Sequence, residues 1–466
     1  MLENNQSKSF RWIPDPMALI FYILVFTWVL TWIIPAGTFD RVEINGRMGV
    51  VADSFHYIEG GKLSFLDIFF AVPKGMVAAS SVIFITLIAG GLFHLLSSTK
   101  MLENAVGTMV KHLGRERGGL IVWITTFIFG LLGIAVGYEN NIALVPIAVL
   151  VGLAIGGDLL VGLGIAIGGI GFGFATSPIN PYTVGVSHAI ADLPLFSGAD
   201  VRSIFSFLIL CLVAHHNARY LKKIQKNPEK SLAKGLATKG NLELAKPLNQ
   251  YSMSGKDWGI LGIFIAGLAI MLYGVFWHKW YINEIAGIFL AIAIFAGLVS
   301  GLKPNDIVAK FTEGASAVVG GALLIGFARG IQVLLDDARI GDTIINALAS
   351  HLGDFPVVIS SILMSIVHGI INFFIPSGSG QAMATMPIMI PLSDLVGMTR
   401  QVAVSAFQVG DGFTNMITPT SGGTLAMLAL AGVTYDRWVK FFVPLLFKAY
   451  ILAWIFLAIT TAMNWS

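Results

Sequence analysis

The chain has 466 residues, of which 56% are hydrophobic and only 12% are charged, and its mean hydropathy is +0.80. Average soluble domains are about 45–50% apolar and about 25% charged. This chain therefore has too little polar surface for a water-soluble globule, which excludes a cytosolic enzyme, a nucleic-acid binder and a disordered chain. The net charge of +3 is too small to indicate a polyanionic partner, and the single cysteine, Cys211, excludes a disulfide framework and a cysteine-based metal site.

The apolar residues are grouped in segments that predict an all-α polytopic membrane protein. Residues 1–16 lack the layout of a signal peptide and run directly into an apolar segment at 17–36. We therefore expect residues 1–63 to hold a cytoplasmic N-terminus, a first span and an external loop. Further apolar segments follow, several of them too short to span alone: 75–96, 119–136, 142–155, 159–175, 182–191, 201–214, 257–277, 284–302, 314–335, 357–375, 381–392, 402–412, 422–431 and 441–462.

The basic residues predict the orientation. Residues 215–256 carry nine lysines and arginines against two glutamates, so the positive-inside rule predicts a cytoplasmic loop. Residues 100–117 are also basic, and we place them on the same side. Residues 336–354 carry four aspartates against one arginine, and we place them outside.

An internal repeat is the strongest signal in the chain. Residues 75–114 align without a gap on residues 314–353, at an offset of 239 positions. Because the amphipathic piece after the first long helix is basic in one copy and acidic in the other, the copies are predicted to be inverted in the membrane, as in secondary transporters. The predicted division is repeat one, the basic cytoplasmic loop, two linking spans and repeat two: 64–214, 215–256, 257–302 and 303–466.

Each repeat is interrupted at two equivalent places. The first is a polar tip, at residues 137–141 and 376–380, which predicts two re-entrant hairpins. The second is a proline-containing break, at residues 176–181 and 418–423, which predicts two broken helices because proline removes a backbone donor and clashes with the preceding turn. Freed backbone groups cannot face lipid, so both breaks are expected to be buried in protein or to line a cavity.

Half-helix ends and polar side chains at these places predict a shared binding site near the midplane. Helix N-termini favour a carboxylate, and C-termini with bare carbonyls favour a cation. The candidate residues for substrate or ion binding are Glu139, Asn140, Asn141, Ser177, Asn180, Ser377, Ser379, Asp411, Asn415, Thr418, Thr420 and Ser421. Hydroxyl and amide oxygens suit a hard cation, so sodium is a candidate ligand at Asn141, Ser177, Ser379 and Thr420.

The tips and breaks resemble a known family. Residues 137–141, 171–181, 376–381 and 410–423 look like the YfcC-like branch of the anaerobic dicarboxylate carrier (DcuC-like) family, over nearly the whole chain. The resemblance implies a scaffold and a transport domain, a homodimer with elevator-like movement, and a multi-pass carrier of the inner (plasma) membrane. It also implies four-carbon dicarboxylates as substrates or, for this branch, basic amino acids. Sodium-coupled relatives carry Ser-Asn-Thr at each tip, and this chain does not, which leaves the coupling ion and the substrate open.

Ionisable residues at membrane depth are costly and call for a partner. We expect Glu139 to line the site as the partner of a substrate amine or a cation. Asp411 could bind a coupling cation or accept its proton. Arg329 is expected to reach the outer interface with its long side chain, although a substrate carboxylate or Asp411 could also neutralise it.

The sequence thus predicts a secondary active transporter, a symporter or an antiporter, working by alternating access. Its substrate is a small carboxylate-bearing metabolite, either an amino acid, including a basic one, or a four-carbon dicarboxylate. No cofactor is expected, and Na⁺ or H⁺ is the candidate coupling ion. The expected partners are the substrate, membrane lipid and a second copy of the chain, with no nucleic acid.

An ion or solute channel is the alternative, since broken helices also occur in pores. Enzyme motifs are absent from the sequence, so an enzyme is not expected.

Overall fold

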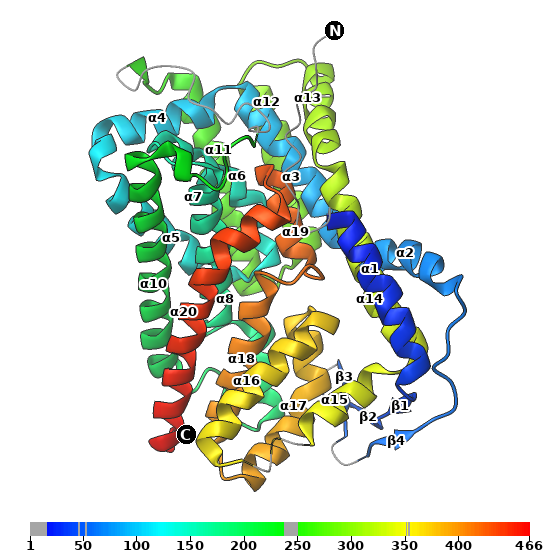
Figure 1. The fold of residues 1–466 in the computed structure, drawn as a ribbon. Coiled ribbons are helices and arrows are strands. Elements are labelled where there is room, and N and C mark those ends of the chain that lie inside the picture. The colour runs from blue at the N-terminus through cyan, green and yellow to red at the C-terminus, as the bar shows by residue number, and fades with distance from the viewer. Residues whose placement is uncertain (1–15, 45–46, 52–53, 237–249, 351, 353–354) are drawn as a thin grey trace.

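The computed structural model describes residues 16–44, 47–51, 54–236, 250–350, 352 and 355–466. The predicted cytoplasmic N-terminus, the centre of the basic loop and the acidic residue Asp354 lie outside the described residues. The described part is almost entirely helical (Figure 1). The predicted class, an all-α polytopic membrane protein, is confirmed.

The first part of the chain contains α1 and four short strands: α1 (Pro16–Ile33), β1 (Gly37–Thr38), β2 (Arg41–Ile44), β3 (Arg47–Val50) and β4 (His56–Tyr57). The predicted repeat one follows, with α2 (Asp67–Ala78), α3 (Ser80–Ser98), α4 (Met101–Leu113), a 3₁₀ turn (Arg115–Arg117), α5 (Gly118–Val136), a 3₁₀ helix (Glu139–Leu144), α6 (Val145–Ala154), α7 (Leu159–Leu163), a π-helical turn (Gly164–Gly168), α8 (Gly169–Ala175), a second π-helical turn (Pro181–Gly185), α9 (Val186–Ile190) and α10 (Ala199–Lys226).

The second part begins with a short 3₁₀ turn and two long helices: Pro228–Lys230, α11 (Gly255–His278) and α12 (Ile282–Val299). The predicted repeat two then comprises α13 (Pro304–Ala317), α14 (Val319–Ala338), α15 (Gly341–Ala349), α16 (Val357–Phe374), α17 (Gly378–Leu395), α18 (Arg400–Asn415), α19 (Gly422–Ala431) and α20 (Tyr435–Ala462).

The helix boundaries recur at the offset that the sequence predicts. α3 and α14 begin 239 positions apart, and so do α5 and α16. α7 and α18 begin 241 positions apart, which fits two inserted residues. These positions support the predicted repeat, whereas the inversion of its copies across a membrane stays a prediction.

Packing partners recur in the same way. α2 packs against α14 and α3 against α13, so the first helices of the two copies cross over one another. α5 packs against α8 and α10, and α16 packs against the corresponding α18 and α20. The copies meet in the core between α8 and α18, where the rings of Phe172 and Phe413 lie edge to face with centroids 4.9 Å apart.

Among the described residues, eight helices are long and apolar enough to cross a membrane: α3, α5, α10, α11, α12, α14, α16 and α20. α4 and α13 lie at one end of the molecule, and α15, the strands and the C-terminus lie at the other (Figure 1). The basic α4 and the acidic α15 segments are thus at opposite ends, as their charges predict. Which end faces the cytoplasm stays a prediction.

The segment after α1 departs from the expectation of a plain external loop. β1 pairs antiparallel with β4, and β2 pairs antiparallel with β3. The Arg41 guanidinium donates to both carboxylate oxygens of Asp342 on α15, at 3.1 and 2.8 Å, and so ties the β2–β3 pair to the second copy. β3 also packs against α17.

Candidate functional site

Both predicted helix breaks are present. α8 ends at Ala175 and helical structure resumes at Pro181, while α18 ends at Asn415 and α19 begins at Gly422. Both hairpin tips are also interrupted, since α5 ends at Val136 and α16 ends two residues before the tip residue Pro376. The chain therefore has four non-helical stretches in otherwise apolar segments, and their backbone groups need partners.

Three of the predicted site residues cap the helices that follow these stretches. The Asn180 side chain accepts hydrogen bonds from the amides of Tyr182 and Thr183, at 2.9 and 3.2 Å, ahead of a proline at the first helical position. The hydroxyls of Ser377 and Ser421 cap α17 and α19 in the same manner. Such caps satisfy amides that a helix start leaves free.

Two other predicted residues donate to carbonyls near the ends of α5 and α16, the helices that precede the two tips. Ser177 donates to the Ile134 carbonyl at 3.0 Å, and Thr420 donates to the Phe373 carbonyl at 2.8 Å. Each bond thus joins a break to the end of the helix before the tip in the same copy, and the two acceptor residues occupy equivalent positions in the repeat. Five of the predicted site residues therefore form hydrogen bonds with backbone groups at the interruptions: Asn180, Ser377, Ser421, Ser177 and Thr420.

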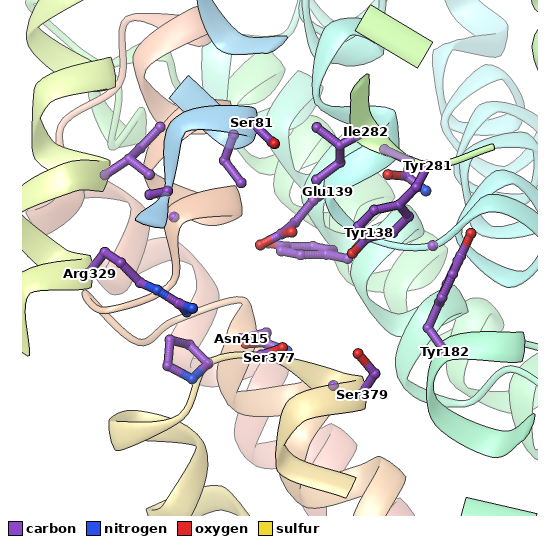
Figure 2. A pocket seen from close by; sticks show the side chains of 18 of the residues that line it. Ser81, Tyr138, Glu139, Tyr182, Tyr281, Ile282, Arg329, Ser377, Ser379 and Asn415 are labelled. Carbon is purple, nitrogen blue, oxygen red and sulfur yellow. The ribbon is translucent and has the colours of Figure 1, made fainter. Parts of the chain in front are cut away.

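A cavity of about 290 Å³ lies where the two tips and the second break meet (Figure 2). This volume is near the lower limit of about 300 Å³ for small-molecule sites. Its wall is formed by Ala78, Ala79, Ser81, Val82, Gly137, Tyr138, Glu139, Asn140, Phe174, Tyr182, Tyr281, Ile282, Ile325, Arg329, Pro376, Ser377, Gly378, Ser379, Asn415, Thr420 and Gly422. Both predicted copies and α12 contribute to it.

Two opposite charges face this cavity. Figure 2 shows Glu139 and Arg329 pointing into the same space from different elements, with Ser377 and Asn415 below them. Glu139 begins the 3₁₀ helix after the first tip, and Arg329 projects from α14. Both side chains are half-buried, and within the described chain neither belongs to an ion pair of 4.0 Å or less.

The structure brings half of the predicted site residues together at the cavity: Glu139, Asn140, Ser377, Ser379, Asn415 and Thr420. The other half does not line it: Asn141, Ser177, Asn180, Asp411, Thr418 and Ser421. Of the candidate sodium ligands, Ser379 and Thr420 reach the cavity, whereas the Asn141 amide donates to the carbonyls of Leu132 and Gly137. No cluster of three or more His, Cys, Asp or Glu suited to a metal ion occurs among the described residues.

The expectation that Arg329 reaches the outer interface is wrong, because its side chain lines the cavity. Its helix, α14, packs against α1, α2, α3 and α19, and Figure 2 shows the Arg329 side chain pointing from this helix into the cavity. Three tyrosines of the cavity were also not predicted: Tyr138, Tyr182 and Tyr281. The rings of Tyr182 and Tyr281 contact each other with centroids 4.9 Å apart, and they form an aromatic side of the cavity.

A second cavity, of about 300 Å³, shares Ser377 and Ser379 with the first. Its other lining residues include Arg41 and Val50 from the β2–β3 pair, and Met383 from α17. The tip of α17 is therefore bordered by cavities on two sides.

Comparison with known families matches residues 13–462 to the family described as "C4-dicarboxylate anaerobic carrier", DcuC. The chain belongs to the DcuC family. Membership confirms the resemblance of the tips and breaks, and it makes the protein a multi-pass membrane protein of a carrier family.

Two relatives cover nearly the whole chain. A protein of Escherichia coli (strain K12) named "Putative basic amino acid antiporter YfcC" is 29% identical over 92% of this chain and 93% of its own length. An "Uncharacterized protein" of Haemophilus influenzae (strain ATCC 51907 / DSM 11121 / KW20 / Rd) is 28% identical over 95% of this chain and 96% of its own. Among solved structures, Neisseria gonorrhoeae MtrF, described as an antimetabolite efflux pump, is 18% identical, with a TM-score of 0.45 over 97% of this chain and 96% of that one.

Proposed function

We propose that this DcuC-family protein is a secondary active transporter that carries a small zwitterionic metabolite, an amino acid, by alternating access. The observation that supports the proposal is the pair of opposite charges, Glu139 and Arg329, on one cavity of about 290 Å³. A molecule with an ammonium and a carboxylate group would neutralise both charges at once. A charge buried without such a partner is costly.

The carboxylate would bind at the Arg329 side. Arg329 offers a planar fork of donors that matches a carboxylate, and the N-terminus of α17 reaches the cavity at Ser377, Gly378 and Ser379. The positive end of the helix dipole favours an anion there.

The ammonium group would bind at Glu139, with the Tyr138 ring beside it (Figure 2). The face of an aromatic ring attracts a cation, so both groups favour an amine. A four-carbon dicarboxylate, the substrate class in the name of the family, would place its second carboxylate against Glu139. The name of the Escherichia coli relative, a putative basic amino acid antiporter, agrees better with a substrate that carries an amine.

Counterflow in proteoliposomes tests this proposal. The full chain is reconstituted, and exchange of labelled L-arginine, L-leucine and succinate is measured for the wild type and Glu139→Gln. We expect the wild type to exchange an amino acid, and we expect Glu139→Gln to weaken its binding about tenfold to a hundredfold. Such a loss corresponds to one charged hydrogen bond of about 1.5–3 kcal/mol.

Asp337→Asn is the matched control, because Asp337 is an exposed acid on the same α14 as Arg329, outside the cavity wall. Its hydrogen bond raises the pKa of Lys74, which stays charged in the variant. Exchange of succinate alone, with Glu139→Gln unchanged, would disprove the amine role. Conductance without saturable exchange would instead favour a channel.

A further inference from the structure

Asp411 is a buried carboxylate outside the cavity wall. It lies near the C-terminal end of α18, its side chain is 0% exposed, and neither carboxylate oxygen has a hydrogen-bond partner within the described chain. Its position is tightly fixed. A Cβ atom on Gly410 would lie 2.4 Å from the Ser365 carbonyl oxygen, and one on Gly412 would lie 2.3 Å from Cβ of Ala175.

The carboxylate lies directly behind the tip of α17. A Cβ atom built on Gly378 would be 3.3 Å from Asp411 Oδ2, with Thr183 at 2.8 Å and the Phe174 ring at 3.3 Å. Gly378 is the first residue of α17 and lines the cavity, as does Phe174. Gly378 therefore lies between Asp411 and the place where a substrate carboxylate would bind.

No described cation pairs with this carboxylate. Of the titratable groups on the helices packed against α18, His368 on α16 is buried, with Gln381 at its Nδ1, and Tyr450 on α20 contacts Phe413. α8 has no titratable residue, and the turn after Asn180 contributes Tyr182. Asp394 on α17 is bound by Arg400 at the far end of α18. Across the cavity stands Glu139, which carries the same charge as Asp411.

Ionising a carboxylate in this setting costs free energy, because a buried charge without a partner loses its hydration and forms no compensating interaction. Protonation removes the charge. A substrate carboxylate at the α17 tip would bring a second negative charge next to Asp411 and would make protonation still more favourable. The converse follows from linkage: a proton on Asp411 strengthens the binding of the substrate carboxylate by the same factor.

We propose that Asp411 is the proton-binding site of the transporter, loaded together with the substrate carboxylate, so that one proton accompanies each substrate molecule. The inference rests on the proposed function. The chemical step is the formation of one O–H bond between a proton from water on one side and a carboxylate oxygen of Asp411. The same bond breaks on the other side, where the proton returns to water. No other bond changes.

Asp411→Asn tests this inference in proteoliposomes that contain the full chain, with labelled L-arginine, L-leucine and succinate as probes. The asparagine copies the protonated acid in shape and charge but cannot release a proton. We expect the variant to keep counterflow of the probe that the wild type exchanges, and to lose uptake driven by a pH gradient. In detergent, the Kd of the wild type for this probe is expected to rise about tenfold per pH unit once Asp411 ionises, as linkage to one proton requires. The Kd of the variant should stay flat.

Asp337→Asn serves again as the control and should keep the wild-type pH dependence. A wild-type Kd that does not change with pH, or a variant that still accumulates probe in a pH gradient, would overturn the inference. So would accumulation driven by a sodium gradient alone. These results leave probe exchange intact, and they differ from a failure of the proposed function, in which the wild type exchanges none of the three probes. In that case both proposals fall. A wild-type Kd that stays flat with pH overturns the inference even if Asp411→Asn does not fold.

Discussion

Arg329→Gln is expected to weaken substrate binding about a hundredfold or more. Among the described residues of the cavity wall, Arg329 is the one arginine, and its guanidinium would make charge-assisted, bidentate hydrogen bonds to the substrate carboxylate. Removing one partner of such a pair costs about 2–5 kcal/mol, partly because the other charge is left buried and unpaired. Arg329→Lys should recover only part of the affinity, since an ammonium group keeps the charge and loses the fork.

The measurement is the half-saturating concentration for counterflow in proteoliposomes, with Arg219→Gln as the control, because Arg219 is an exposed arginine near the C-terminal end of α10. Both amino acids and dicarboxylates carry a carboxylate, so exchange of either class should suffer. An unchanged half-saturating concentration in Arg329→Gln would mean that the carboxylate binds elsewhere.

Gly133→Ala is expected to cause a large loss of stability. A Cβ atom at this position of α5 would lie 2.1 Å from the carbonyl oxygen of Ile170 on α8, and a backbone atom cannot move aside as a flexible side chain can. The contact is reciprocal, since a Cβ on Gly173 of α8 would lie 2.1 Å from the carbonyl oxygen of Gly130. Overpacking of this kind costs about 1–3 kcal/mol or more.

The matched control is Gly119→Ala on the same helix, where an added Cβ would meet no atom of the described residues within 4 Å. Alanine favours the helix over glycine by up to about 1 kcal/mol, so this variant should be neutral or slightly stabilised. Thermal unfolding in detergent compares the two, and we expect a Tm several degrees lower for Gly133→Ala alone. Equal Tm values would show that α5 and α8 can separate without cost.

The interruptions of the fold could be predicted from the sequence because proline and glycine act locally. Pro178 and Pro181 remove backbone donors wherever the chain goes, and the observed gap between α8 and the next turn, 176–180, almost coincides with the predicted break. The second break begins at Met416, earlier than predicted, because α18 already ends at Asn415, ahead of Pro419. The β2–β3 pair was not predicted, although Asn45-Gly46 is a sequence signal for a hairpin.

The cavity wall was predictable only in part, because it depends on which elements become neighbours. Glu139 and Ser377 sit at tips that the repeat brings together, and both line the cavity. Arg329 and Tyr281 come from a long span and a helix start with no local motif, so only the packing of α14 and α12 reveals them. Asp411 was predicted as a site residue, yet the close fit of its flanking glycines holds it behind the wall.

The contact between Tyr182 and Tyr281 has a stereochemical consequence. These rings border the cavity on a third side, apart from the charged side chains of Glu139 and Arg329 (Figure 2). Three non-equivalent anchors around one carbon atom define a handedness, so mirror-image amino acids would direct their side chains to different walls. A transporter built in this way would accept one enantiomer and exclude the other.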